Sequence, residues 1–171
     1  MGNEGAQSGY EQAIARVLER LDITGLPMPA KPKDYGAEYD YPADPSVLTS
    51  TGLGQLKARL TGWHGYAIRL IAIAEVPHDL LATSFNIALG RKMNLIADRP
   101  GEKRQLKDTL RAAALESDPV LESAARKLAE WAAYIKVLKA QASIFEMQAK
   151  SLSREQSRRS DEIRMRQGSG G

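Results

Sequence analysis

The C-terminal part of the chain sets the fold through residues 118–166, which read DPVLESAARKLAEWAAYIKVLKAQASIFEMQAKSLSREQSRRSDEIRMR. Asp118 followed by Pro119 is typical of a helix start, because Asp caps free backbone N–H groups and proline suits the first helical position. Apolar residues then recur at alternating steps of three and four, with no glycine or further proline among them. They are Leu121, Ala124, Leu128, Trp131, Ile135, Leu138, Ala142, Phe145, Ala149 and Leu152. This pattern predicts one very long helix with an apolar seam.

A second long helix is predicted before it, from residues 51–53 to about Ile96. Its apolar track is Leu56, Leu60, Trp63, Ala67, Leu70 and Ala74. Pro77 lies on the same track, and a proline inside a helix removes a hydrogen bond, so a kink or a restart is expected there. Residues 98–101 then form a turn, and a shorter helix is expected over residues 102–115.

These elements predict an all-α fold, a long antiparallel helical hairpin over residues 51–166. Residues 1–50 are expected to form a short helix at 10–21 and an acidic arm rich in Pro and Tyr, and residues 167–171 a flexible tail. The tyrosines favour an arm that docks, and the alternative interpretation is a mobile linker. A helix of roughly 70 Å, at about 1.5 Å per residue, is longer than a compact domain of this size. The hairpin is therefore expected to assemble into a homo-oligomer through coiled-coil-like seams. The expected packing residues are Leu60, Trp63, Leu70, Leu121, Leu128, Trp131, Ile135, Leu138, Phe145 and Leu152.

The sequence offers little for catalysis. It has no cysteine, so thiolate nucleophiles, thiolate metal sites and disulfides are excluded. His64 and His78 stand in no metal-ligand motif, and the glycines at 52 and 54 lack the Gly-Lys-Ser/Thr ending of a phosphate loop. We therefore predict a protein that is not an enzyme, has no metal or other cofactor, and does not span a membrane.

Basic charge collects towards the C-terminus. Residues 1–50 hold 4 Lys/Arg against 8 Asp/Glu, whereas residues 101–171 hold 14 against 10. Near the end of the long helix, basic residues recur at steps of four, which aligns them in a stripe that could follow a phosphate backbone. The candidate DNA-binding residues are Lys150, Ser153, Arg154, Arg158, Arg159, Arg164 and Arg166. The alternative interpretation of this charge run is an ordinary solvated helix face.

Residues 52–166 resemble the phage recombination mediators related to the T-even phage mediator protein. The matching features are Asp118 opening a long helix, Trp131 within the heptads, and the Ser153-Arg154 pair near the end, with Trp63 in the other hairpin arm. The longer acidic front end, about two extra helical turns and Pro77 depart from that pattern. The resemblance implies a ring-like oligomer in the cytoplasm of a bacterial host that binds single-stranded DNA. It also implies that the protein helps a recombinase to displace single-strand binding protein.

Two other classes of protein remain open. A small terminase subunit of phage DNA packaging is also helical and oligomeric, but no second recognition helix of a helix-turn-helix can be placed here. A structural coiled-coil protein without a nucleic-acid role would use the basic end only as a solvated face. Salt-dependent DNA binding separates this last class from the others.

Overall fold

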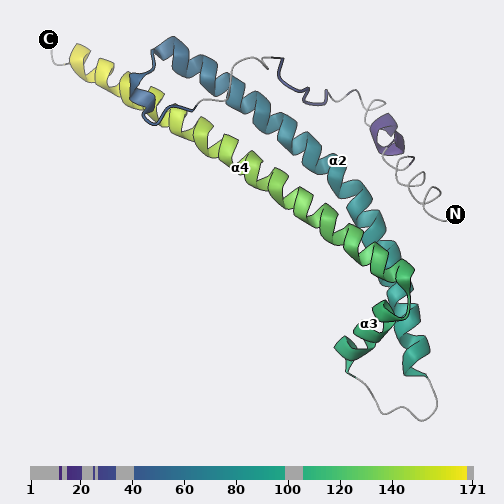
Figure 1. The fold of residues 1–171 in the computed structure, drawn as a ribbon. Helices are drawn as coiled ribbons and strands as arrows, with labels where there is room; N and C mark the ends of the chain where they lie inside the picture. The colour runs from purple at the N-terminus through teal and green to yellow at the C-terminus, as the bar shows by residue number, and fades with distance from the viewer. Residues whose placement is uncertain are drawn as a thin grey trace. The chain divides into compact units, whose positions relative to one another are not determined.

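The protein is mostly helical. A computed structural model describes residues 12, 15–20, 25, 27–33, 41–98 and 106–168, and these include no strand. The elements are the 3₁₀ helix η1 (Pro45–Val47) and the α-helices α2 (Ser50–Ala97), α3 (Lys107–Glu116) and α4 (Pro119–Gly168) (Figure 1). The predicted all-α class is confirmed, and so is the pair of long helices packing against each other.

The chain divides into two compact units. One, here called the α3 unit, comprises Met1–Leu26 and Ala72–Lys136. The other, here called the arm unit, comprises Pro27–Ile71 and Val137–Gly171. Each unit takes one part of α2 and one part of α4, and each has its own apolar contacts.

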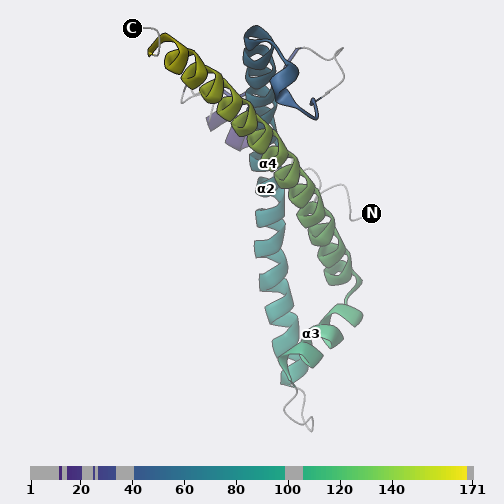
Figure 2. The same cartoon turned by 90° about the vertical axis from the view of Figure 1, so that its left-hand side faces the viewer.

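The core of the α3 unit forms where three helices meet. Phe85, Leu89 and Ile96 of α2 pack with Ala114 of α3 and Leu121 of α4 in one buried cluster. Figures 1 and 2 both show α3 beside the end of α2 and the beginning of α4. The alanine at 114 is fully buried, since a small side chain lets α3 approach the two longer helices closely.

In the arm unit, the first part of α2 packs against the second part of α4. Trp63 stacks on Phe145 with ring centroids 6.4 Å apart and an interplanar angle of 28°. Nearer the beginning of α2, the Lys57 ammonium donates to the Gln156 side-chain oxygen at 3.5 Å. An earlier residue of α2 thus meets a later residue of α4, so the two segments run antiparallel.

Both long helices begin with side-chain caps. The Asp118 carboxylate accepts hydrogen bonds from the backbone N–H groups of Val120 at 3.0 Å and Leu121 at 3.3 Å. The predicted start of this helix is therefore confirmed. At the other long helix, the Thr49 hydroxyl accepts from the N–H of Gly52 at 3.0 Å, so α2 begins slightly before the predicted position.

Pro77 does not interrupt α2, so of the two alternatives predicted there, a kink or a restart, the restart is wrong. The helix runs through Pro77 from Ser50 to Ala97. Pro77 itself is buried, and so are Ala74 before it and Leu81 after it. Burial of the turns on both sides stabilises the helix enough to offset the one backbone hydrogen bond that proline removes.

The predicted apolar positions lie on the covered sides of the long helices. Among the predicted packing residues, Leu60, Leu121, Ile135, Phe145 and Leu152 are buried. The others, Trp63, Leu70, Leu128, Trp131 and Leu138, are half-buried. Of the predicted N-terminal helix, residues 12 and 15–20 are helical, and its other positions lie outside the described residues, as do residues 99–105.

Candidate nucleic-acid interface

Positive charge gathers on the helices of the arm unit. Its part of α2, residues 50–71, holds Lys57, Arg59 and Arg69 and no acidic residue. Its part of α4, residues 137–168, holds seven basic and four acidic residues. The basic end predicted from the sequence is therefore joined by basic residues from the other helix of the same unit.

The first two candidate DNA-binding residues have partners within their own helix. The Lys150 ammonium lies 2.5 Å from a carboxylate oxygen of Glu146, one turn earlier, and this bond lowers the pKa of Glu146. The Ser153 hydroxyl donates to the carbonyl of Ala149 at 2.9 Å. Lys150 remains well exposed, so a phosphate can reach it, whereas the Ser153 hydroxyl already has an acceptor.

Glu155 binds two of the candidate arginines at once. The Arg158 guanidinium donates from Nε at 2.8 Å and from Nη2 at 2.7 Å, one bond to each carboxylate oxygen. Arg159 Nε donates to the same carboxylate at 2.7 Å. These hydrogen bonds, first from Arg158 and then from Arg159, lower the pKa of Glu155 to about 2. Arg158 also pairs with Glu162, and its own pKa is raised, so this cluster stays fully ionised across the physiological range.

Arg159 also ties α4 to the chain before α2. Its Nη2 donates to the carbonyl of Ser46 at 2.9 Å, across 113 positions of sequence. Ser46 belongs to a short strap, residues 44–47, in which the Asp44 carboxylate accepts from the N–H of Ser46 at 2.9 Å and from its hydroxyl at 2.8 Å. These bonds lower the pKa of Asp44. The Arg159 side chain therefore points to the strap and not along the stripe of basic residues that the sequence predicts.

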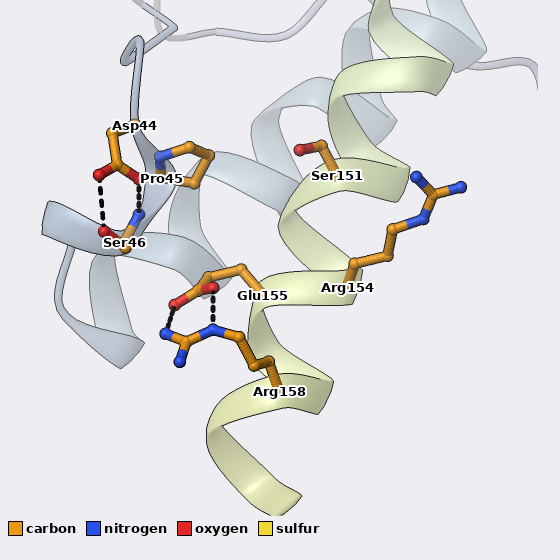
Figure 3. Close-up of a pocket in the computed structure, with 7 residues that line it drawn as sticks. All are labelled: Asp44, Pro45, Ser46, Ser151, Arg154, Glu155 and Arg158. Atoms are coloured by element: carbon orange, nitrogen blue, oxygen red, sulfur yellow. Dashed lines mark hydrogen bonds and ion pairs between the residues drawn. The ribbon is translucent and has the colours of Figure 1, made fainter. Parts of the chain in front are cut away.

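A shallow pocket of about 250 Å³ lies between the strap and α4 (Figure 3). It is lined by Asp44, Pro45, Ser46, Ser151, Arg154, Glu155 and Arg158. Figure 3 shows the Arg154 side chain directed away from the Glu155–Arg158 pair. The pocket wall thus combines a neutralised ion pair with one guanidinium that is not part of it.

Arg154 and Arg164 are the cations best placed for a new ligand. Both are exposed, and neither has a hydrogen bond or ion pair within the described part of the chain. Arg166 is exposed as well, although it already has an interaction. A phosphate would meet least competition at Arg154 and Arg164, because no carboxylate has to be displaced.

Only part of the ionic cluster around Glu155 could be predicted from the sequence. Glu155 stands three and four residues before Arg158 and Arg159, a spacing that favours ion pairs on one helix, so this signal was available. The contact of Arg159 with Ser46 had no such signal, because it joins distant parts of the chain. Among the described residues, no group of His, Asp and Glu has the arrangement of a metal site. No described helix is long and apolar enough to cross a membrane.

Comparisons of the chain with models of protein families, with curated protein sequences and with solved structures find no match.

Proposed function

We propose that this protein is a non-enzymatic, self-assembling DNA-binding protein that binds single-stranded DNA and acts as a recombination mediator. In this role it would help a recombinase to replace single-strand binding protein. The nucleic-acid part of the proposal rests on the charges described above, and the mediator part rests on the resemblance of residues 52–166 to phage recombination mediators.

One observation carries the DNA-binding proposal. The helices of the arm unit hold ten basic side chains against four acidic ones, and Arg154 and Arg164 have no partner among the described residues. Unpaired guanidinium groups on an exposed helix face supply the sequence-independent attraction to phosphates. Half-buried Arg59, from the basic part of α2, adds a further guanidinium without a described partner.

Exposed apolar residues on α4 support self-assembly. Val137 and Met147 are 66% and 59% exposed, and Ile144 is 39% exposed. Their steps of seven and three place them along one side of α4, as the apolar residues of a helix interface are placed. We propose that a second copy of the chain covers this stripe, residues 137, 144 and 147, because a hairpin of two helices leaves it uncovered.

A structural assembly protein without a nucleic-acid role is the second candidate. One observation favours it: Arg158 and Arg159 are already bound by Glu155, and Lys150 by Glu146. Ion pairs of this kind, spaced three or four residues apart, are common on solvated helix faces.

The deciding experiment measures binding of the full chain to single-stranded and double-stranded DNA over a range of salt concentrations. The proposed function predicts preferential single-strand binding whose affinity falls linearly on a log–log plot against salt. Strand exchange by a recombinase, in the presence of competing single-strand binding protein, then tests the mediator role. Absence of binding even at low salt would select the structural candidate.

A further inference from the structure

A face of α2 in the arm unit approaches the proline-rich arm closely. Gly62 and Gly65 are three residues apart, so they lie on the same side of the helix, and Arg69 follows one turn later. The residues of α2 that are buried in the arm unit include Leu60, Ala67 and Ile71, which lie on a different side. Packing against α4 therefore does not explain the glycines, each of which costs a helix about 0.5–1 kcal/mol relative to alanine.

The arm lies against both glycines, at a distance that would put an added Cβ in ordinary van der Waals contact. A Cβ atom placed on Gly65 would lie 3.5 Å from Cβ of Pro29, and one placed on Gly62 would lie 3.5 Å from Cγ of Pro32. The two prolines are three residues apart, like the two glycines, and they meet them in the opposite chain direction. The two glycines thus leave this side of α2 without side chains, and the two proline rings pack against it.

Arg69 adds a polar contact at the same place. Its Nη1 donates to the carbonyl of Pro29 at 3.1 Å, so the backbone of the arm is held as well as its rings. Proline cannot donate from its own nitrogen, and its fixed φ keeps such a segment extended at little cost in conformational entropy. Tyr66, the neighbour of Gly65, is half-buried and packs edge-on against Trp63, which stiffens this side of α2.

We infer that the α2 surface formed by Gly62, Gly65 and Arg69 is a binding site for a proline-rich extended peptide. Residues 27–33 of the same chain, PMPAKPK, are its built-in ligand. In this site, proline rings pack on a flat helix surface and one guanidinium donates to a backbone carbonyl. Both contacts suit an extended, proline-rich segment. This site does not depend on the proposed DNA-binding role, although Arg69 is also one of the ten basic side chains of the arm-unit helices.

Disulfide trapping tests the site directly, because the native chain has no cysteine. The 3.5 Å between the two Cβ positions lies within the range that a disulfide needs, so a Pro29→Cys/Gly65→Cys variant should lose both free thiols on mild oxidation. The product should run as a single cross-linked chain on a non-reducing gel. A Pro29→Cys/Gly90→Cys variant is the control, since outside the neighbouring turns of its own helix no atom of the described residues, Pro29 included, lies within 4 Å of a Cβ on Gly90, and it should keep its thiols. Equal thiol loss in both variants, or none in either, would overturn the site.

The source of the ligand is tested by mixing the single variants Pro29→Cys and Gly65→Cys. Little covalent dimer is expected beyond that formed by Pro29→Cys alone. A strong cross-link between the two different variants would mean that the arm of a second copy occupies the site, and would overturn the same-chain assignment.

Recognition of a free peptide separates a true binding site from a contact imposed by the connecting chain. The probe is a peptide of residues 27–33 carrying Pro29→Cys, and the target is Gly65→Cys in a chain whose own Pro29 and Pro32 are changed to Ser. Under the same mild oxidation, this peptide should form a disulfide with the target several-fold faster than a matched peptide in which Pro27 and Pro32 are also replaced by Ser. Equal rates for the two peptides would overturn the recognition of proline-rich segments.

Discussion

Glu155 and Arg158 form a two-pronged ion pair on α4, with Nε donating to Oε2 at 2.8 Å and Nη2 to Oε1 at 2.7 Å. The pair lies on the helix face that the basic sequence pattern singles out for DNA. The candidate DNA-binding cations thus include some that a carboxylate already binds and others that are free to bind a phosphate.

Removing the two free arginines should weaken binding to single-stranded DNA. In an Arg154→Gln/Arg164→Gln variant we expect lower affinity and a salt dependence reduced by about 1.4 in log–log slope, if each arginine contacts one phosphate. Fluorescence anisotropy over a salt series measures both quantities. Arg126→Gln is the matched control, because Arg126 is an exposed arginine of α4 that lies in the α3 unit and pairs with Glu122. If the control lost as much as the double variant, the assignment to the free arginines would be wrong.

Neutralising Glu155 should have the opposite effect. Glu155→Gln removes the carboxylate that binds both Arg158 and Arg159, leaving Arg158 only its pair with Glu162 and Arg159 only its bond to the Ser46 carbonyl. Less negative charge then competes with phosphate, so the affinity for single-stranded DNA should rise. Glu122→Gln makes the same change in charge and releases Arg126 outside the proposed interface. A rise that is no larger for Glu155→Gln than for this control would show that only net charge matters.

Acid should remove the contribution of Glu155 to stability. Its folded-state pKa of about 2 lies below the ordinary value of 4.5, so its contribution is present above that value and is lost as the pH falls towards 2. Urea unfolding at a series of pH values should show a smaller decline across this window for Glu155→Gln than for the native chain. An unchanged decline would mean that the ion pair does not persist in solution.

Truncating the stacked ring of the arm unit should destabilise the hairpin. Phe145 is buried against Trp63, so we expect Phe145→Ala to lower the free energy of unfolding by about 3–5 kcal/mol. Ile163→Ala, at an exposed position of the same helix, should change it by less than about 0.5 kcal/mol. Urea unfolding must be compared at one protein concentration, because self-assembly also adds to apparent stability. Similar losses in the two variants would contradict the packing described here.

Polar substitutions on the exposed stripe of α4 should reduce assembly. Val137→Gln/Ile144→Gln removes two apolar side chains that the hairpin leaves exposed, so the mass measured by light scattering should fall at micromolar concentration. Leu106→Gln is the control, since Leu106 is exposed but lies just before α3. A native chain that is monomeric in this concentration range would refute the proposed self-assembly.

The amino-acid sequence by itself determined the helices. The spacing of Leu121 to Leu152 predicted one side of α4, and Asp118 before Pro119 predicted its first turn, because heptad periodicity and capping are local properties of the chain. Phe85 was not assigned from the sequence, since its burial requires α3 and α4 to meet α2 around it. At Pro77 the sequence left a kink and a restart open, and the tertiary structure excludes the restart, because burial of the neighbouring turns opposes the local effect of proline.

Only the tertiary structure decided how the candidate site is arranged. Sequence spacing put Arg158 and Arg159 together in one basic run, but the fold turns Arg159 to the carbonyl of Ser46 and leaves Arg154 and Arg164 without a partner among the described residues. It likewise brought Pro29 and Pro32 onto Gly65 and Gly62. These contacts join residues far apart in the chain, and whether a charge is neutralised or a glycine covered depends on which distant segment packs there.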